Sequence, residues 1–293
     1  MFIAGIDGGG TSTKVELRTE AGRLIGRKKF GPFNMNSIGE NGFRTLLQTV
    51  FSDCGGMQDC GSLCVGAAGI SNERVRSVLD EELRRAGFSG KLLLVGDQEI
   101  ALRGAMEEPG IALISGTGSI AFGKNAAGET ARSGGYGHLI DDEGSGYALG
   151  RDTLSAVVRA LDGRGEKTAL VEAVFDTLKI GNLQELVAFT YGKDTDKSKI
   201  AKVSLLAVQC AQAGDETARA ILRKGAEELA ILVKAVQRKL DLPGCKIALL
   251  GGLIQEDNAY RRCVAERLQA LGTPVAPEQD ALWGAAQMAF ELK

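Results

Sequence analysis

The sequence predicts an α/β fold made of two related copies of one unit, in which three antiparallel strands are followed by two strand-helix pairs. Three kinds of segment recur in the same order in both halves: a strand pair joined by a glycine-hydroxyl turn, a strand ending in small residues, and an Ala-Leu-x-Gly-Ala segment. Three ordered matches indicate gene duplication. The matching segments are Ile3–Arg18 with Ile111–Lys124, Leu63–Gly69 with Ile247–Gly252, and Ala101–Ala105 with Ala281–Ala285.

The first copy is expected to occupy residues 1–107. After its hairpins and the strand at 63–69, apolar residues at helical spacing predict a helix over 72–86 that stops at Gly87. A short buried strand at 91–95 then places Asp97 at its carboxyl end, and a helix over 98–106 follows. The Glu-Glu-Pro-Gly cluster at 107–110 is a turn signal and marks the boundary between the copies.

The second copy is expected to occupy residues 108–293, and a length of 293 residues suits about two domains. Residues 141–240 are predicted to be mainly helical, with no counterpart in the first copy, so they are interpreted as an insertion. The C-terminal helix, 280–293, is expected to pack back on the first domain. Helices are predicted at 147–161, 167–178, 183–191, 197–213 and 215–240.

Composition narrows the function classes. The chain has 35 basic and 37 acidic side chains, a formal net charge of -2, and no long run of either sign, so a nucleic-acid partner is not expected. No stretch approaches the roughly 20 apolar residues that span a bilayer, and the N-terminus starts with a core strand instead of a signal peptide. Six scattered cysteines fit reduced thiols, which predicts a cytoplasmic protein without a membrane partner.

The two glycine turns are predicted to bind the phosphates of ATP, because glycine lets backbone N–H groups approach an anion and hydroxyls can donate to phosphate oxygens. Asp7 precedes the first turn and is predicted to hold Mg²⁺ through water, whereas Ser115 replaces it in the second. The alternative is that such turns only connect strands. The predicted phosphate-binding residues are Gly8, Gly9, Gly10, Thr11, Ser12, Thr13 and Lys14, with Gly116, Gly118 and Ser119, and Thr117 as a further donor.

Two other nucleotide-binding classes are excluded by local pattern. The run Ser115 to Ala121 contains G-x-G-x-x-A, which imitates a dinucleotide-binding fingerprint, but that fingerprint needs a helix after the glycines. Here residues 119–124 are predicted to form a strand. No G-x-x-x-x-G-K-[ST] segment occurs, so a P-loop kinase is not expected.

Asp97 is the predicted catalytic residue. It lies at the carboxyl end of a parallel-type strand, where ligand crevices of open α/β sheets lie. In phosphoryl transfer, a carboxylate that orients the attacking hydroxyl and accepts its proton late is sufficient. An alternative role as the N-cap of the following helix does not exclude this one.

The chain resembles the BadF/BadG/BcrA/BcrD family of the actin-like, hexokinase-like ATPase superfamily, and within it the N-acetylglucosamine kinases. The resemblance implies duplicated ribonuclease H-like (actin-like ATPase) domains and an ATP-dependent transfer to an amino sugar, most simply N-acetylglucosamine or glucosamine. The glycine-aromatic-aspartate run at 134–147 is its most specific part. The segments that carry the resemblance are 5–14, the loop 34–39, 96–97, 115–119, 134–147, 211–215 and 249–252.

The resemblance also implies which residues surround the ligands, and that the protein is a homodimer. Tyr136 and Asn36 stand where relatives often have larger aromatic residues, so the preference for an N-acetyl group is open. Asp142 is alternatively a helix-start residue, and the single histidine, His138, is interpreted as structural. The implied sugar-binding residues are Asn34, Asn36, Asp97, Thr117, Gly135, Tyr136 and Asp142, and the implied adenine-binding residues are Gly214, Gly251 and Gly252.

Two other functions are kept as alternatives. One is the ATPase activator of a 2-hydroxyacyl-CoA dehydratase-type enzyme, which requires exposed cysteines for an iron-sulfur cluster. The grouping of Cys54, Cys60 and Cys64 is the only candidate for such a site, and Cys64 falls inside a predicted strand. The other is a non-catalytic nucleotide-dependent sensor, against which the presence of both Asp7 and Asp97 argues.

Overall fold

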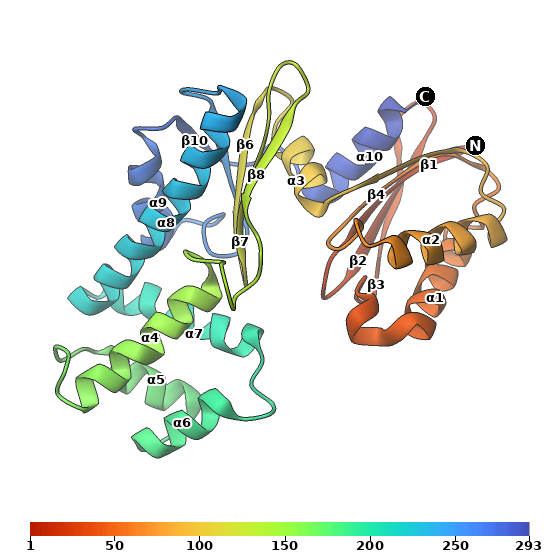
Figure 1. The fold of residues 1–293 in the computed structure, drawn as a ribbon. Helices are drawn as coiled ribbons and strands as arrows, with labels where there is room; N and C mark the ends of the chain where they lie inside the picture. Colours follow the sequence, from red (N-terminus) through yellow and green to blue (C-terminus); the bar gives the residue numbers. More distant parts are fainter. Residues whose placement is uncertain (293) are drawn as a thin grey trace. The chain divides into compact units, whose positions relative to one another are not determined.

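The computed structural model describes residues 1–292 and divides the chain into two compact units. The first unit contains Met1–Glu107 and the chain from Pro277 onward, and the second contains Glu108–Ala276. Each unit is built on one five-stranded mixed sheet, so the predicted α/β fold class is confirmed (Figure 1).

The first sheet has the order β3-β2-β1-β4-β5, in which β1, β2 and β3 are antiparallel and β1, β4 and β5 are parallel. One pair of helices, α1 and α2, covers one face, and α3 and α10 cover the other (Figure 1). The elements of this unit are β1 (Phe2–Gly8), β2 (Thr13–Thr19), β3 (Leu24–Phe30), α1 (Met35–Asp53), β4 (Cys60–Ala67), α2 (Glu73–Arg85), β5 (Lys91–Val95), α3 (Asp97–Ala105) and α10 (Ala281–Glu291).

Alternation along β1 explains the two layers of helices. Ala4 and Ile6 point into the core shared with α1 and α2, while Ile3 points into the core shared with α3 and α10. Successive side chains of a strand point to opposite faces, so a strand that is apolar on both faces is buried between two helical layers. The central position of β1 and β4 in the sheet follows from this pattern.

Helix α1 is not among the helices that the sequence predicts. From the sequence, only a loop is expected at 34–39, where the helix begins. The helix has 19 residues, and its geometry is broken at Gly39, where φ is 70°. Phe43, Leu47 and Val50 form its buried face. The break interrupts the helical spacing near the first turn, so the periodicity is regular only from Phe43 onward.

The repeated Ala-Leu-x-Gly-Ala segments meet each other in the first unit. A Cβ atom at Gly104 in α3 would overlap the carbonyl oxygen of Asp280, and one at Gly284 in α10 would lie 2.7 Å from the Gly104 backbone nitrogen. Glycine at both positions therefore lets the backbones of α3 and α10 approach closely (Figure 1). The segment that revealed the duplication is a helix-packing contact.

We expect Gly104→Val to lower the free energy of unfolding by about 2 to 3 kcal/mol, because a side chain forced against a fixed backbone costs energy by overpacking. Valine has a better helix propensity than glycine, so a loss of stability must come from the contact with α10. Urea unfolding followed by circular dichroism measures it. The matched control is Gly26→Val on β3, where an added Cβ meets nothing within 4 Å. Equal unfolding midpoints for Gly104→Val and the wild type would contradict this packing.

The second sheet has the order β10-β9-β6-β7-β8, with β6, β7 and β8 antiparallel and β6, β9 and β10 parallel. Read from β8, this is the same arrangement as in the first unit read from β3. The strands are β6 (Gly110–Ser115), β7 (Ser119–Lys124), β8 (Thr130–Gly134), β9 (Lys246–Leu250) and β10 (Thr273–Val275), and the helix between β9 and β10 is α9 (Ala259–Leu268).

The helical insertion lies between β8 and β9 (Figure 1). Helix α8 packs on the sheet, because a Cβ atom at Gly123 of β7 would lie 2.8 Å from Val236. Helix α4 packs closely on α7, where a side chain at Gly150 would overlap the backbone of Ile200. The inserted helices are α4 (Gly146–Leu161), α5 (Leu170–Leu178), α6 (Leu183–Tyr191), α7 (Lys197–Gln212) and α8 (Glu216–Leu240).

Within residues 1–292, no helix combines the length and the apolar character needed to cross a membrane.

Candidate active site

The two acidic residues singled out from the sequence lie at the same edge of the first sheet. In the register of the parallel strands, Asp7 is opposite Gly66 on β4, and Gly66 is opposite Val95 on β5. Asp97 follows Val95 by two residues at the start of α3. Strands are about 4.8 Å apart, so Asp7 and Val95, on either side of β4, lie about 10 Å apart, and Asp97 follows just beyond the end of β5. The charges of Asp7 and Asp97 interact, since the Asp97 carboxylate contributes to raising the pKa of Asp7.

The Asp7 carboxylate is largely buried, with 17% of its side chain exposed. Burial raises the pKa of Asp7, and the Lys14 ammonium, 3.4 Å away, opposes this rise. A cation beside Asp7 would compensate the cost of ionising it in this place. Because hydrated Mg²⁺ prefers carboxylate oxygen, the residue fits the predicted role.

Asp7 would be the main protein ligand of such an ion. Residues 1–292 contain no group of three or more His, Cys, Asp or Glu side chains placed to hold a metal. In phosphoryl-transfer sites, Mg²⁺ is commonly bound by one or two carboxylates, and water and the phosphates of the substrate complete its coordination. The grouping of Cys54, Cys60 and Cys64 is not such a site either.

The first glycine turn has glycines of two kinds. A Cβ atom at Gly8 would lie 2.7 Å from Ala67 and 2.8 Å from the Phe33 ring, so Gly8 is required for packing. Gly10 faces open space, with nothing within 4 Å of an added Cβ. Of the predicted phosphate-binding residues in this turn, Gly10 and the exposed Thr11 are therefore accessible to an anion, together with the partly exposed Gly9 and Ser12.

Thr13 does not fit its predicted role as a phosphate donor. It is fully buried on β2, and its hydroxyl donates to the carbonyl oxygen of Gly31 at 2.8 Å. This bond attaches β2 to the segment after β3 and leaves the hydroxyl unavailable. Lys14, the next residue, is half exposed and paired with Asp7.

The predicted alternative role of Asp97 as a helix N-cap is wrong. The N-cap of α3 is Gly96, whose N–H donates to the Glu99 carboxylate at 3.0 Å. Asp97 is the first residue of the helix, and its Oδ1 accepts from the N–H of Gln98 at 3.1 Å. Because Gly96 and Glu99 complete the cap, the helix start does not depend on the Asp97 side chain for capping.

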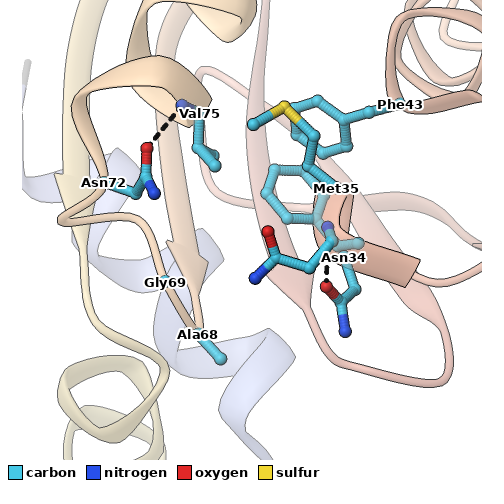
Figure 2. Close-up of a pocket in the computed structure, with 9 residues that line it drawn as sticks. Asn34, Met35, Phe43, Ala68, Gly69, Asn72 and Val75 are labelled. Carbon is cyan, nitrogen blue, oxygen red and sulfur yellow. Dashed lines mark hydrogen bonds between the residues drawn. The ribbon is translucent and has the colours of Figure 1, made fainter. Parts of the chain in front are cut away.

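A small pocket lies beside this edge of the sheet, between the starts of α1 and α2 (Figure 2). Its volume is about 60 Å³, and Asn34 and Asn36, two of the predicted sugar-binding residues, line it together with Asn72. The N–H of Phe33, which also lines the pocket, donates to the carbonyl oxygen of Gly9 at 2.9 Å. The pocket therefore adjoins the first glycine turn.

In the second unit, the glycine turn after β6 is bonded to the first residues of α4. The Gly146 N–H donates to the carbonyl oxygen of Gly116 at 2.7 Å, and the Tyr147 N–H to that of Thr117 at 3.3 Å. Two segments of the resemblance, 115–119 and 134–147, thus form one structure. A Cβ atom added at Gly116 would meet nothing within 4 Å, whereas one added at Gly118 would lie 2.8 Å from the Asp142 carboxylate.

Both serines of this turn are committed to the protein. The Ser115 hydroxyl donates to the carbonyl oxygen of Gly144 at 2.9 Å, and the Ser119 hydroxyl donates to that of Glu143 at 2.8 Å. Both residues are buried. In this structure the Ser119 hydroxyl is therefore committed to Glu143 and not to a phosphate. The Gly116 N–H also donates within the turn, to the carbonyl oxygen of Gly118 at 2.9 Å, which leaves Thr117 as the candidate donor.

Asp142 is not at a helix start, so that alternative prediction is also wrong. Helix α4 begins at Gly146, and its N-cap is Ser145, whose side chain accepts from the Ala148 N–H. Asp142 has a left-handed backbone with φ of 63°, is 6% exposed, and accepts from the Ser119 N–H at 3.5 Å. Burial raises the pKa of Asp142. An aspartate in this strained conformation holds the loop against the turn.

Tyr136 is accessible on the same loop, with 61% of its surface exposed. The Arg132 guanidinium lies 4.6 Å from the centre of the Tyr136 ring, and the backbone N–H of Tyr136 donates to the Asp141 carboxylate at 3.1 Å. The neighbouring Gly135 has φ of 77°. His138 packs edge-on against Tyr147 with ring centres 4.6 Å apart, which agrees with its interpretation as a structural residue.

The three glycines expected near adenine differ in their surroundings. Gly214, with φ of 102°, joins α7 to α8 and is exposed. A side chain at Gly251 would overlap the backbone of Ser115, so this glycine allows the chain after β9 to approach β6. A Cβ atom added at Gly252 would meet nothing within 4 Å. Gly214 and Gly252 are therefore accessible to a ligand, whereas glycine is required at position 251 for packing against Ser115.

Sequence reasoning missed two residues that shape the site. Asn72 caps α2, with its Oδ1 accepting from the Arg74 N–H at 2.9 Å, and it also lines the pocket. The signal was available, because asparagine before a helical run is a typical N-cap. Phe33 is buried against Gly8, and its position between the turn and α1 had no local signal.

Comparison with known proteins gives one family and several relatives. The model of the BadF/BadG/BcrA/BcrD ATPase family matches residues 4–289. A Clostridium acetobutylicum protein named N-acetylmuramic acid/N-acetylglucosamine kinase is 36% identical over 88% of this chain and 87% of the relative. The N-acetyl-D-glucosamine kinase of Dictyostelium discoideum is 33% identical over 83% and 81%. A Chromobacterium violaceum crystal structure, described as a candidate N-acetylglucosamine kinase, is 27% identical, with a TM-score of 0.78 and 98% coverage of both chains.

Proposed function

The chain belongs to the BadF/BadG/BcrA/BcrD ATPase family, and from this we infer that it is an ATP-dependent kinase of amino sugars. It transfers the γ-phosphate of ATP to a hydroxyl of the sugar, with N-acetylglucosamine or glucosamine as the acceptor. The observation that carries the proposal is the placement of Asp7 and Asp97 at one edge of the first sheet. Two relatives above 30% identity are named as kinases of N-acetylated amino sugars.

In this proposal the two carboxylates have separate tasks. Asp97 accepts a hydrogen bond from the attacking hydroxyl, orients its oxygen and takes its proton late in the reaction. Asp7 holds the magnesium ion of Mg·ATP through water, and the bound ion supplies charge neutralisation at the phosphates. The buried position of Asp7 suits this task, because a carboxylate whose pKa is raised by burial has a strong electrostatic reason to bind a cation.

We assign fewer residues of the two glycine turns to phosphate binding than the sequence predicts. In the first unit we assign the Gly10 N–H group and the hydroxyls of Thr11 and Ser12, because the Gly9 N–H donates to the carbonyl oxygen of Ser12 at 3.0 Å. In the second unit we assign Thr117 and the turn around Gly116. Preorganised donors of this kind stabilise the charge on a transferring phosphoryl group. The hydroxyls of Thr13 and Ser119 are left out, since both donate to protein carbonyl groups.

For the sugar we keep Asn34, Asn36, Tyr136 and Gly135 as contacts through accessible groups. Asp142 is kept as a proposed sugar contact, and its buried carboxylate also fixes the turn beside Gly118 by accepting backbone hydrogen bonds from Ser119 and Gly137. Gly214, Gly251 and Gly252 stay proposed for the adenine side.

A coupled assay of ADP release, run across amino sugars and neutral hexoses, tests the function. We expect ADP formation to depend on an added amino sugar, and kcat/KM to be higher for amino sugars than for glucose. Phosphate release without a sugar provides the control for plain ATP hydrolysis. If no sugar raised ADP formation above this background, the kinase proposal would be wrong.

No observation favours the ATPase activator of a dehydratase. Burial raises the pKa of Cys54 to about 11 and that of Cys60 and of Cys64 to about 12, so these thiols remain protonated at neutral pH. Protonated, buried thiols are poor cluster ligands, because the thiolate is the ligand. The sensor alternative is likewise not favoured, since Asp7 and Asp97 are both present.

Two further proposals concern the state of the protein in the cell. All six cysteines are free, which supports the cytoplasmic location predicted from the sequence. The homodimer implied by the resemblance stays a prediction, and analytical ultracentrifugation across a range of protein concentrations measures it.

A further inference from the structure

The carbonyl oxygen of Gly144, in the loop before α4, accepts hydrogen bonds from two hydroxyls that belong to distant segments. The Ser115 hydroxyl donates to it at 2.9 Å, and the Tyr260 hydroxyl, from α9, donates to it at 2.6 Å. A carbonyl oxygen has two lone pairs, so the two donors use its hydrogen-bonding capacity in full. All three residues are buried. The loop is therefore attached to β6 and to α9 at one buried point.

Packing alone explains the ring of Tyr260 but not its hydroxyl. Among residues 1–292, Tyr260 is the largest fully buried side chain. Phenylalanine would fill the same space, and a buried hydroxyl costs free energy unless it is hydrogen-bonded. Two glycines let this hydroxyl reach the loop: a Cβ atom at Gly225 of α8 would lie 2.8 Å from the hydroxyl oxygen, and one at Gly144 would lie 2.7 Å from the Gly225 carbonyl oxygen. The backbone is thus built around the bond to Gly144.

Ser115 and Tyr260 are also bonded to the turn after β9, which contains the glycines proposed for the adenine side. The Leu253 N–H donates to the Ser115 carbonyl oxygen at 3.2 Å, and the Asn258 Nδ2 group donates to the Leu253 carbonyl oxygen at 2.9 Å. The Tyr260 N–H donates to the Asn258 Oδ1 at 2.8 Å. Together with the two bonds to Gly144, these form a closed ring of hydrogen bonds. The ring connects the turn after β9 to the loop before α4.

On its other side, Gly144 lies two residues after Asp142, which is a proposed sugar contact. The backbones of both residues are left-handed, with φ of 63° at Asp142 and 76° at Gly144. A left-handed aspartate persists only where its surroundings fix it. The Ser119 hydroxyl holds Glu143, between the two, by a 2.8 Å bond to its carbonyl oxygen. Because this segment is short and has no regular secondary structure, a shift of the Gly144 carbonyl would also move the Asp142 carboxylate.

Ser115 occupies in the second copy the position that Asp7 occupies in the first. The side chain of Asp7 is 17% exposed, whereas Ser115 is fully buried and its hydroxyl is used inside the protein. The duplicated position therefore differs in its task between the copies. In one copy it carries the proposed metal-binding acid, and in the other it carries a hydroxyl that attaches a loop.

We propose that Tyr260 and Ser115 are positioning residues of the kinase, whose hydroxyls hold the Gly144 carbonyl group and thereby set the position of the acceptor loop, residues 134–147. Both hydroxyls are buried, so they act through the loop and not on the sugar directly. The inference rests on the proposed function and adds two residues to it. A small misplacement of groups that orient a substrate lowers the rate of reaction strongly, so the effect of losing either hydroxyl should appear in the kinetics with the sugar.

The test is Tyr260→Phe, which removes the hydroxyl and keeps the ring. We expect kcat/KM for the amino sugar to fall by about 5- to 10-fold, the effect of one neutral hydrogen bond. The KM for ATP is expected to stay within about twofold of the wild type, because the variant alters the acceptor side. The coupled ADP assay measures both, with N-acetylglucosamine or glucosamine, whichever the wild type phosphorylates faster. Calorimetric titration of a nonhydrolysable ATP analogue measures the nucleotide affinity separately.

A second variant, Ser115→Ala, removes the other donor and is expected to lower kcat/KM for the sugar by a similar factor. In each single variant one hydroxyl still satisfies the Gly144 carbonyl group. In the double variant this buried carbonyl has lost both hydroxyl donors, so we expect its loss to exceed the product of the two single effects.

The matched control is Ser62→Ala in the first unit. Ser62 is likewise a buried serine on a strand, and its hydroxyl donates to the carbonyl oxygen of Ala289 at 2.7 Å. This variant loses the same kind of bond in a place that does not hold the acceptor loop. We expect it to lower the melting temperature and to leave kcat/KM for the sugar unchanged.

The outcomes separate the two proposals. If Tyr260→Phe and Ser115→Ala lower the melting temperature but keep wild-type kinetics, as expected for Ser62→Ala, the two hydroxyls only stabilise the fold and the positioning role is wrong, while the kinase proposal stands. A rise in the KM for ATP as large as that for the sugar would also contradict it. Circular dichroism shows whether each variant is folded, and Ser115→Ala decides alone if Tyr260→Phe is not. If no sugar raises ADP formation by the wild type, both proposals fail together.

Discussion

Asp97→Asn is expected to lower kcat by about 10²- to 10⁴-fold, the range for loss of a positioned general base. The affinity for ATP is expected to stay nearly unchanged, because Asp97 acts on the acceptor hydroxyl. Asparagine keeps the size of the side chain, and the capping of α3 by Gly96 and Glu99 does not involve it. The measurement is the coupled ADP assay for kcat, together with calorimetric titration of the ATP analogue.

Asp280→Asn is the matched control for charge. The carboxylates of Asp97 and Asp280 both contribute to raising the pKa of Asp7, but Asp280 caps α10 and pairs with Arg27. If Asp97 acted only through the charge state of Asp7, Asp280→Asn would reproduce part of the loss. We expect its kcat to stay within about threefold of wild type, since a surface ion pair contributes little. Wild-type turnover in Asp97→Asn would remove Asp97 from the mechanism.

Asp7→Asn is expected to lower kcat with Mg·ATP by about 10²- to 10³-fold, the magnitude seen when one electrostatic stabiliser of a transition state is removed. It should also reduce the rise in melting temperature that Mg·ATP produces in the wild type, since that rise depends on ligand affinity. Differential scanning fluorimetry with Mg·ATP, without ligand and with ATP in EDTA separates the contribution of the ion.

Without ligand, Asp7→Asn is expected to stabilise the folded protein, whereas with Mg·ATP it is expected to reduce the stabilisation by the ligand. Burial raises the pKa of Asp7 in the folded chain, so ionisation of this carboxyl disfavours folding. That cost is absent below the unfolded-state pKa and reaches its full size as the pH rises through the folded-state pKa. Asparagine cannot ionise, so Asp7→Asn without ligand should be at least as stable as wild type at pH 7, and its advantage should shrink as the pH is lowered toward 3.8, the ordinary pKa of an aspartate.

Asp53→Asn is the control for this second prediction. Asp53 is half exposed and pairs with Lys28 at the end of α1, so it shares the change of group but lies away from the glycine turn. Its melting temperature should rise with Mg·ATP as in the wild type. An Asp7→Asn variant that kept both the full ligand-induced rise and wild-type kcat would show that Asp7 does not hold the ion.

Much of the architecture could be predicted from the sequence because its signals are local. Strands, turns and helices leave patterns within a few residues, and duplication repeats those patterns in order. The position of Asp97 after a strand was therefore available, as was the Asp7 turn, but the prediction that this strand is buried was wrong, because β5 is an edge strand in which only Val95 is buried. The first half of α1 was not, because Gly39 breaks the helix where its apolar spacing should have begun.

The candidate site was predictable in outline only. A sequence shows that Thr13 and Ser119 carry hydroxyls, but whether these are free depends on Gly31 and Glu143, which approach them only in the folded chain. Asp142 gave a helix-start signal that Ser145 satisfies instead.

For this protein, the sequence by itself determined the duplicated sheets, the two glycine turns and the placement of the acids at strand ends, because backbone preferences and hydrophobic periodicity act over short stretches of chain. Only the tertiary structure decided which polar groups remain available to a ligand, and that Asn34 and Asn72, from separate helices, line one pocket. Hydrogen-bond partners and cavities arise from packing between distant segments, and no local pattern records them.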